Sequence, residues 1–572
     1  MAIFNGEKDK TKKKKGDDSK GFKYLGGILL SKMAAGGAAL LRRNAKKVND
    51  LNVFPVPDGD TGDNMRMTIE SGIAALETLE TDDIAEVMKV LSHGMLLGAR
   101  GNSGVILSQF FAGTSKGLDG VEKADPRAMG KALEMGVKQA YGSVMTPTEG
   151  TILTVAREAV EFANKRITEK STIRTYFADL AKEMHDSLDR TPELLSTLKE
   201  AGVVDSGGAG LFYIIDGFNR VLNGEEIDGG DAPAEKPASF INTSFNADSE
   251  MTYGYCTEAL LQLQNKKCDP DKFDVEALKV FLASVGDSIV AFKTESIIKL
   301  HVHTLTPERV LEHCRRYGEF LSVKIENMSV QHTSLENGEK LEGPADAPKP
   351  KVKKQNAVVA VCNGEGIEEL YRELGADEII YGGQTHNPST NEFLDAFARI
   401  YAEHIFVFPN NGNVLMAANQ AAELYTDARV HVIPSKNIGM GYVALSTADL
   451  SSDNAAEIEG GMREAMQAVI SGYVSPSIRD ADLNGVHIKN GDTIGIIEKE
   501  VVVSAKERLK AAEILADMML EGRYMLTVFC GKDATEAEQN TLTEAINAKR
   551  PDAEVYFIPA GQDIYPYIFV AE

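Results

Sequence analysis

The chain has 572 residues, of which 43% are hydrophobic and 26% charged, a composition typical of soluble globular proteins and not of disordered or fibrous ones. A single hydrophobic core rarely extends over so long a chain, so roughly two to four domains are expected. Lysine and arginine number 61 against 85 acidic residues, and the net charge of −24 excludes a general nucleic-acid binder and leaves at most a peripheral membrane contact.

The amino-terminal residues 1–20 are expected to form a disordered tail. The lysine run at 12–15 could touch anionic lipid, but neighbouring aspartates and glutamates dilute its charge. No apolar stretch approaches ~20 uninterrupted residues, so neither a signal peptide nor a membrane span is predicted. Five scattered cysteines without CxxC spacing argue against a disulfide framework and favour a reducing, cytoplasmic compartment.

Two segments rich in glycine, proline and charge, 229–237 and 337–351, predict linkers. They divide the chain after the tail into three domains, at 21–228, 240–336 and 355–572. The first domain is expected to be nearly all helical, because apolar residues recur there at three- and four-residue spacing. The segments with this spacing are 84–98, 126–141, 151–165, 172–188 and 192–202.

The second domain is predicted to have an α+β fold, since polar and apolar residues alternate over 297–303 as in a strand. In the third domain, short apolar runs at 357–361, 405–408 and 430–433 alternate with helical stretches. That alternation predicts an α/β domain with a parallel sheet.

Asp58 and Asp60 lie in a turn-rich segment, residues 52–65, that leads into a helical pattern over 67–79. Two carboxylates one residue apart can hold a hard cation, and flanking glycines let backbone N–H groups approach phosphates. The alternative is a surface turn with an aspartate N-cap. An EF-hand loop is excluded, because Gly62 and Ile69 stand where it needs oxygen ligands.

Two further glycine-rich segments, 98–104 and 203–210, each follow one predicted helix and open another. Either alone is explained by helix capping. Three such loops in one helical domain can instead gather backbone N–H groups into an anion cradle. No P-loop, protein-kinase motif set or strand-borne GxGxxG is present, so a nucleotide site here would be of a different class.

The motifs at 52–62 (NVFPVPDGDTG), 98–104 (GARGNSG) and 204–210 (VDSGGAG) resemble the ATP-binding subunit of bacterial fatty acid kinase. The nucleotide domain of that family is similar to the nucleotide-binding subunit of dihydroxyacetone kinase. The resemblance covers almost the whole chain after the tail. It implies an up-and-down helical barrel that binds ATP and Mg²⁺, an α+β middle domain and a DegV-like α/β domain at the carboxyl end.

The resemblance implies that Asp58 and Asp60 are catalytic Mg²⁺ ligands. It also implies these nucleotide contacts: Asn52, Thr61, Asn64, Gly101, Asn102, Ser103, Gly104, Asp205, Gly207 and Gly208. Dihydroxyacetone kinases have another metal-binding aspartate where Val53 stands, which leaves the number of Mg²⁺ ions open, and Asn52 could supply the missing oxygen. Asp63 is either an extra acceptor or a charge at a helix N-terminus.

His301 and His303 are two residues apart on the strand predicted at 297–303, so both can reach one ion, with Cys256 as a candidate third ligand. Ordinary strand polarity is the alternative. The sequences at 255–258 (YCTE) and 300–304 (LHVHT) look like the family's middle domain, where a cysteine and two histidines bind zinc. Zn²⁺ is therefore implied as a cofactor, structural or functional.

Three polar loops, 383–390, 409–413 and 434–441, each follow a predicted parallel strand and precede a helix. Such loops gather at the carboxyl edge of the sheet, where ligands usually bind, although simple turn chemistry is the alternative. This domain is similar to the family's carboxy-terminal part, which resembles DegV-type fatty-acid-binding proteins and is implicated in engaging such a partner.

The leading functional hypothesis is phosphoryl transfer from ATP to the carboxylate of a fatty acid presented by a DegV-type protein, giving an acyl phosphate for phospholipid synthesis. One alternative is a dihydroxyacetone-type kinase of a small hydroxylated substrate. Another is a non-catalytic nucleotide sensor that regulates a lipid-binding partner. The resemblance also suggests a homodimer.

Overall fold

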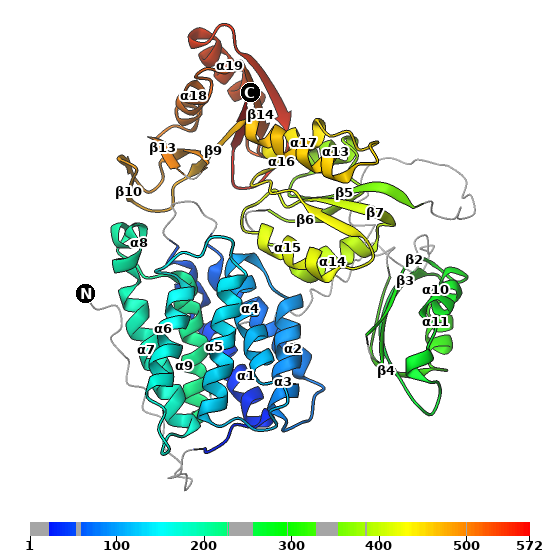
Figure 1. Cartoon of the computed structure of the whole chain (residues 1–572). Helices are drawn as coiled ribbons and strands as arrows, with labels where there is room; N and C mark the ends of the chain where they lie inside the picture. Colours follow the sequence, from blue (N-terminus) through cyan, green and yellow to red (C-terminus); the bar gives the residue numbers. More distant parts are fainter. Residues whose placement is uncertain are drawn as a thin grey trace, which may run out of the picture.

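The computed structural model describes residues 22–52, 59–225, 227, 255–294, 296–327, 353–383, 386–498 and 500–572. Its elements form three units, which we call the helical unit (22–227), the middle unit (255–327) and the α/β unit (353–572) (Figure 1). The expected tail and both expected linkers lie outside the described residues.

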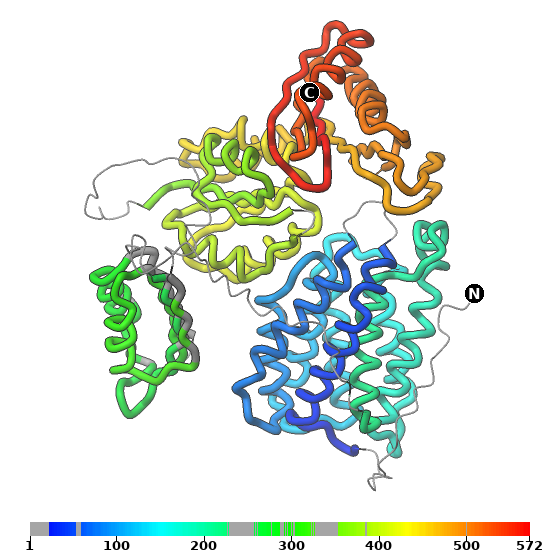
Figure 2. Tube along the Cα trace, turned by 180° about the vertical axis from the view of Figure 1, so that it is seen from behind, coloured from blue at the N-terminus to red at the C-terminus, as the bar shows by residue number. Residues whose placement is uncertain are grey.

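The helical unit contains nine helices within its described residues. They are α1 (Gly27–Asn49), α2 (Thr61–Leu76), α3 (Ile84–Leu97), α4 (Gly101–Gly117), α5 (Pro126–Gly142), α6 (Ile152–Lys165), α7 (Ile173–Leu194), α8 (Ser196–Ala201) and α9 (Ser206–Leu222). The long helices run up and down around one apolar core, and α9 packs back against α1 (Figure 2). The expectation of an all-helical barrel is confirmed.

Helix α1 was not expected from the sequence, because Gly36 and Gly37 interrupt its apolar run. These glycines allow α1 to approach α9 closely. A Cβ on Gly37 would lie 2.7 Å from the Ile214 carbonyl oxygen, and one on Gly217 would lie 2.5 Å from the Gly37 Cα. A helix-weakening residue is tolerated here because tertiary packing outweighs propensity. No helix among the described residues is long and apolar enough to cross a membrane.

Two helix boundaries differ from the expectation. Helix α2 begins at Thr61 and not near Met67, so the second half of the aspartate motif is already helical. Helix α7 continues through Pro192, where a new helix was expected to start. Proline has no N–H for the Leu188 carbonyl, but the Thr191 hydroxyl donates to that oxygen at 2.7 Å and satisfies it.

The middle unit is a four-stranded antiparallel sheet, in the order β2-β3-β1-β4, with two α-helices. Its elements are β1 (Tyr255–Leu263), η1 (Pro270–Lys272), α10 (Val275–Ala283), β2 (Asp287–Thr294), β3 (Ile297–Thr304), α11 (Pro307–Cys314) and β4 (Gly318–Asn327). The buried side chains of α10 and α11 form one cluster with alternate residues of the strands. The predicted strand at 297–303 and the α+β class are confirmed.

The α/β unit begins with a four-stranded parallel sheet in the order β6-β5-β7-β8, as the sequence predicts. The strands are β5 (Lys354–Cys362), β6 (Glu378–Tyr381), β7 (Ala402–Phe408) and β8 (Arg429–Val432). The helices that connect and follow them are α13 (Glu365–Glu373), α14 (Thr390–Ala398), α15 (Leu415–Leu424), α16 (Ile438–Ser446) and α17 (Ala455–Ala468).

The last hundred or so residues form a second, mixed sheet in the order β13-β12-β9-β16-β14-β15, in which only the β14–β15 pairing among the described strands is parallel. The apolar runs that predict parallel pairing all lie in the first sheet, where that prediction is confirmed, and none of them falls in this second sheet. Strands β12 and β13 are joined by a hairpin, which permits antiparallel pairing only. The elements are β9 (Ile470–Pro476), β10 (Ala481–Leu483), β11 (Val486–Ile488), β12 (Thr493–Ile497), β13 (Glu500–Ala505), α18 (Arg508–Met519), β14 (Met525–Cys530), α19 (Glu536–Lys549), β15 (Glu554–Pro559) and β16 (Tyr567–Ala571).

The α/β unit sits on one end of the helical unit, with α14 and α15 nearest to α3 and α4 (Figure 1). Ala99 and Val105, at the start of α4, are buried in the same apolar cluster as Phe393 of α14 and Val414 beside α15. The carboxyl ends of β6 and β7 consequently lie over the glycine-rich loop at 98–104.

Candidate functional site

Asp60 stands at the N-cap position of α2, but its side chain makes no capping hydrogen bond. Its Oδ2 atom instead accepts a hydrogen bond from the Asn387 side-chain amide of the α/β unit. The structure therefore does not support the alternative in which Asp60 only caps a helix. Its partner Asp58 lies outside the described residues.

Asn49, which the sequence motifs did not include, takes over the capping of α2. Its Oδ1 accepts the Gly62 N–H at 2.7 Å, and its Nδ2 donates to Asp63 at 2.7 Å. A Cβ on Gly62 would lie 2.2 Å from the Ala45 carbonyl oxygen, so this close approach requires glycine. Asp63 also pairs with Arg66 at 3.3 Å, which agrees with a charge at the helix N-terminus.

The three glycine-rich segments meet at one end of the helical unit. Gly101, the first residue of α4, has φ +58°, and a Cβ there would lie 2.6 Å from the Asn64 side-chain nitrogen. Ser206, the first residue of α9, donates from its hydroxyl to that of Thr61 at 3.4 Å. The amino-terminal ends of α2, α4 and α9 therefore converge, as an anion cradle requires.

A polar pocket of about 190 Å³ lies among these helix ends. It is lined by Asn52, Asp60, Thr61, Asn64, Asn102, Ser103 and Asn413. Six of these seven residues are nucleotide or metal contacts predicted from the sequence, and Asn413 comes from the α/β unit. Small-molecule sites usually measure about 300–1,000 Å³, so the pocket suits the phosphates and cation of a nucleotide better than the whole molecule.

The remaining predicted glycines do not line this pocket. A Cβ on Gly104 would lie 2.4 Å from the Thr68 hydroxyl, and one on Gly208 would lie 3.0 Å from a Val155 methyl group. Gly207 likewise approaches Ile152, at 3.3 Å from such a Cβ. The structure thus gives these three glycines a role in close helix packing, and their nucleotide contacts stay predictions.

Asp205 is the N-cap of α9, and here the capping interpretation is correct. Its Oδ2 accepts the Gly208 N–H at 2.6 Å, and its own N–H donates to the Thr191 hydroxyl at 3.1 Å. The residue is half-buried, with its carboxyl enclosed by protein. Desolvation raises the pKa of this carboxyl to about 6, against the opposing effect of the backbone donors Gly208 and Ile152.

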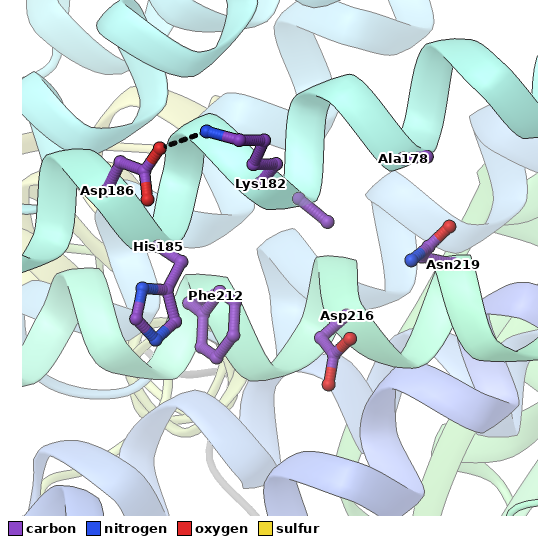
Figure 3. Close-up of a pocket in the computed structure, with 8 residues that line it drawn as sticks. Ala178, Lys182, His185, Asp186, Phe212, Asp216 and Asn219 are labelled. Atoms are coloured by element: carbon purple, nitrogen blue, oxygen red, sulfur yellow. Dashed lines mark hydrogen bonds and ion pairs between the residues drawn. The ribbon is translucent and has the colours of Figure 1, made fainter. Parts of the chain in front are cut away.

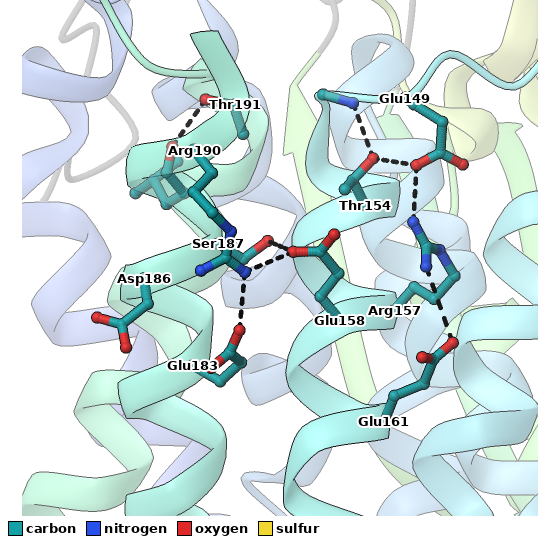
Figure 4. A network of polar contacts seen from close by, with 12 residues as sticks. Glu149, Thr154, Arg157, Glu158, Glu161, Glu183, Asp186, Ser187, Arg190 and Thr191 are labelled. Carbon is teal, nitrogen blue, oxygen red and sulfur yellow. Dashed lines mark hydrogen bonds and ion pairs between the residues drawn. The ribbon is translucent and has the colours of Figure 1, made fainter. Parts of the chain in front are cut away.

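A network of charged side chains fixes the helices beside Asp205 (Figure 4). Arg190 of α7 pairs with Glu158 of α6 at 2.7 Å and with Glu183 at 2.8 Å. The Ser187 hydroxyl adds a bond to Glu158 at 2.8 Å. By tying α6 to α7, the network holds Thr191 in place under the start of α9.

A larger cavity, about 350 Å³, lies on the side of the helical unit between α7 and α9 (Figure 3). Lys182 and Asp186 at its rim neutralise each other as an ion pair. The cavity contains none of the motif residues, so size alone does not identify the site. We assign the functional site to the smaller pocket, where the predicted residues converge.

The polar loops of the α/β unit differ in what they contact. Residues 386–390 and 409–413 follow β6 and β7 and face the pocket end of the helical unit, through Asn387 and Asn413. Asn437, in the loop at 434–441, caps α16 by accepting the Met440 N–H at 2.9 Å. Turn chemistry therefore explains the third loop.

The predicted zinc ligands Cys256, His301 and His303 have side chains outside the described part of the structure. The backbone register pairs Cys256 directly with His303 across β1 and β3, so two of the required Cα positions are adjacent. Among the described residues, no group of three histidine, cysteine or acidic side chains could hold a metal ion. Cys314 is buried in the apolar cluster, and desolvation raises the pKa of its thiol to about 12.

Comparisons with known proteins match almost the whole chain. Family models match in three consecutive parts: a DAK2 domain at 55–220, a FakA-like middle domain of fatty acid kinase at 252–335 and a FakA-like C-terminal domain of fatty acid kinase at 357–572. Protein YloV of Bacillus subtilis (strain 168) is 40% identical over 561 residues, which cover 96% of this chain and 99% of that protein. The chain belongs to the FakA-like fatty acid kinase family.

The chain is also similar to other proteins, over most of its length or over parts of it. An uncharacterized protein of Staphylococcus aureus (strain USA300) is 37% identical over 556 residues, or 96% of this chain and 99% of that one. Among solved structures, dihydroxyacetone kinase from C. freundii in complex with AMP-PNP and Mg²⁺ is 18% identical, with a TM-score of 0.28, over 38% of each chain. The Streptococcus pneumoniae fatty acid kinase B3 protein loaded with linoleic acid is 13% identical over 38% of this chain and 99% of that one, with a TM-score of 0.26. Structural likenesses this weak carry no argument about function.

Membership in this kinase family implies ATP and Mg²⁺, and the residues of the pocket fit both. Asp60 offers a carboxylate, and the buried Oδ1 of Asn102 has no hydrogen-bond partner among the described atoms. Oxygen donors of this kind are the ligands that Mg²⁺ prefers, and an unsatisfied buried acceptor indicates a missing ligand or water.

Proposed function

We propose that this chain is the ATP-using subunit of a fatty acid kinase. It transfers the γ-phosphate of ATP to the carboxylate of a fatty acid that a separate DegV-type fatty-acid-binding protein presents, and so makes an acyl phosphate for phospholipid synthesis. The observation that carries the proposal is the pocket in which Asp60, Asn102 and the starts of α2 and α4 converge. The family membership supports the choice of acceptor.

In this proposal Asp60, together with Asp58, holds the cation, and the start of α4 binds phosphate oxygens. The first N–H of α4 that bonds within the helix is that of Gly104, which leaves the N–H groups of residues 101–103 available to an anion. The ion that Asp58 and Asp60 would hold, Mg²⁺, would supply positive charge against the negative charge that develops on the transferred phosphate.

The acceptor requires no general base from the protein. A carboxylic acid is already ionised at neutral pH and can attack phosphorus directly. The described lining of the pocket accordingly contains amides, hydroxyls and one carboxylate, without a histidine. Positioning and charge neutralisation would therefore supply most of the catalysis.

The proposal also includes a zinc ion on Cys256, His301 and His303, a homodimeric assembly and a cytoplasmic location. The paired register of Cys256 and His303 supports the zinc site. Domain boundaries at 21–228, 240–336 and 355–572 are part of the same proposal, and the three matched family models support them.

The decisive experiment measures phosphate transfer from labelled ATP by the full chain. Three acceptors are compared: a fatty acid loaded on a DegV-type protein, dihydroxyacetone, and none. Acyl phosphate formed with the loaded protein alone is the expected result. Transfer to dihydroxyacetone would favour a kinase of small hydroxylated substrates, and nucleotide binding without transfer to any acceptor would favour a regulatory sensor.

A further inference from the structure

The α/β unit contacts residues 96–100, the segment that leads into the glycine-rich loop of the nucleotide pocket. Arg100, the N-cap of α4, forms an ion pair with Glu392 at 2.8 Å and donates to the Asn387 carbonyl oxygen at 2.9 Å. Gln420 donates to the Leu96 carbonyl oxygen at 2.7 Å. Leu96 and Arg100 both lie in the segment that leads into Gly101, so these contacts fix the approach of α4 to the pocket.

Asn387 reaches from the α/β unit to the centre of the site. Only 3% of this residue is exposed, and its side-chain amide donates to the Asp60 carboxylate. A Cβ on Gly101 would lie 3.4 Å from the same Asn387 nitrogen. Asn387 therefore sits between the aspartate motif and the start of α4, at the point where a cation and phosphates would bind.

Asn413 is the member of the α/β unit that lines the pocket itself. Its backbone N–H donates to Asn411 at 2.9 Å, and the buried Asn411 in turn donates to the Gly383 carbonyl oxygen at 3.0 Å. Asn102 of α4 donates to the Asn413 side chain at 3.4 Å. These hydrogen bonds hold the loop that follows β7 so that the Asn413 side chain lies against Asn102, one of the predicted nucleotide contacts.

We propose that the nucleotide site is shared between the two units: Asn387 is a positioning residue that orients the Asp60 carboxylate for the cation, and Asn413 contacts the bound triphosphate. This inference rests on the nucleotide site of the proposed function and adds to it residues more than 300 positions away in the chain. Because the α/β unit supplies part of the site, its docking and the binding of Mg²⁺–nucleotide stabilise each other by the same free energy.

The bond from Asn387 leaves the coordination chemistry of Asp60 intact. A carboxylate has about four lone-pair directions, and one amide N–H occupies one of them. Carboxylates that ligate metals are commonly oriented by such hydrogen bonds, and removal of the partner typically costs about 10–100-fold in metal affinity. An inhibitory contact would have the opposite consequence, since its removal would tighten binding.

The test measures binding of the ATP analogue AMP-PNP to the full chain by calorimetry, once with Mg²⁺ and once with EDTA. Asn387→Ala should weaken binding of the Mg²⁺ form about 10-fold or more and leave binding in EDTA unchanged, because it acts through the cation ligand. Asn413→Ala should weaken both forms by about 5-fold, as expected for one lost hydrogen bond. Asn391→Ala is the matched control, because this amide pairs locally with Asp395 in α14.

An affinity of Asn387→Ala equal to or tighter than that of the parent chain would overturn the inference, and so would an equal loss with and without Mg²⁺. If Asn387→Ala fails to fold, as judged by thermal unfolding, Asn413→Ala decides the question alone, and unchanged binding by that variant would overturn the shared site. Absence of binding by the parent chain would instead refute the proposed function, so the two failures are distinguishable.

Discussion

At the scale of single residues, two aspartates with similar local sequences have different roles. Asp60 and Asp205 both precede a helix and are followed within two residues by glycine, and the sequence offered helix capping as an alternative for both. The structure shows capping by Asp205 alone, because Asn49 caps α2 and leaves the Asp60 side chain to other partners. That distinction depends on a contact from α1, which the motif itself does not contain.

Replacing Asp60 by alanine should lower phosphoryl transfer by about 100-fold or more, because a ligand for the catalytic cation is lost. The helical fold should remain intact, since the side chain caps no helix, while loss of the acceptor for the buried Asn387 amide should lower the free energy of unfolding by about 1–3 kcal/mol. Asp58→Ala is expected to behave in the same way. Asp63→Ala is the control, and turnover by Asp60→Ala at the level of this control would refute the assignment.

Asp205 should make stability depend on pH. Its pKa of about 6 in the folded protein lies above the ordinary value of 3.8, so the folded state binds the proton more tightly than the unfolded state. The stabilising contribution of the protonated form is complete below about pH 4 and is lost as the pH rises through 6.

Asp205→Asn removes this titration while keeping an oxygen to cap α9. The stability of the variant relative to the parent chain should therefore rise between about pH 4 and pH 6. Denaturant unfolding at several pH values measures the difference. Parallel pH profiles for the two proteins would contradict the raised pKa.

At the scale of secondary structure, helices with regular apolar spacing were predictable from the sequence. Features that depend on packing between distant segments were not. Helices α3, α5 and α6 agree with their expected ranges to within a residue or so, because their apolar spacing is regular. Helix α1 was missed because its glycines serve packing on α9, a reason that lies in tertiary structure. The mixed second sheet was missed because apolar runs do not reveal strand direction.

The start of α4 offers a test with a matched pair of glycines. Gly101 and Gly120 both have positive φ, +58° and +71°, but a Cβ would meet Asn64 only at Gly101 and nothing within 4 Å at Gly120. Alanine at either position should cost about 1 kcal/mol or more of unfolding free energy through backbone strain. Only Gly101→Ala should also weaken nucleotide binding, because it displaces Asn64 in the pocket. Equal binding by both variants would argue against this role for the start of α4.

The middle sheet should carry about one zinc ion per chain when the protein is purified without chelator. Cys256→Ser, or His301→Ala combined with His303→Ala, should abolish zinc binding because each removes required ligands. Cys268→Ser is the control, since this thiol donates to the Tyr317 carbonyl oxygen elsewhere in the unit. Elemental analysis that finds no zinc in the parent protein would remove the site.

At the scale of the whole molecule, the sequence predicted the motifs of the site but not the contact between the helical unit and the α/β unit at the pocket. The aspartate motif and the glycine-rich loop were recognisable, and for the loops at the carboxyl edge of the parallel sheet the sequence left ligand binding and simple turn chemistry as alternatives. The contact of Asn387 with Asp60 joins residues 327 positions apart and leaves no periodic signal in the chain. Only the docking of two folded units brings them together.

Cutting the chain at the expected linkers tests the division of labour. A fragment of residues 1–228 should bind ATP, more weakly than the intact chain, without phosphorylating a fatty acid. A fragment of residues 355–572 should bind the loaded lipid-binding partner without hydrolysing ATP. A mixture should restore little activity, because the linkers no longer keep the units at high effective concentration.

The measurement is acyl phosphate formation by each fragment, by the mixture and by the intact chain, with partner and fatty acid present. Full activity from the first fragment would show that the α/β unit is dispensable for presenting the acceptor. Full activity from the mixture would show that the contacts between the units suffice without covalent linkage.

The chemistry of the contact between the helical and α/β units has a consequence for ionic strength. Asn387, Asn413 and Gln420 join the units through uncharged amides, alongside the ion pair of Arg100 with Glu392. Raising salt from about 0.1 to about 1 M shortens the screening length from about 10 to about 3 Å, which weakens exposed ion pairs and leaves amide hydrogen bonds nearly untouched. The same salt relieves self-repulsion in a chain of net charge −24. The two units should therefore stay docked in concentrated salt, under conditions that separate assemblies held by charge.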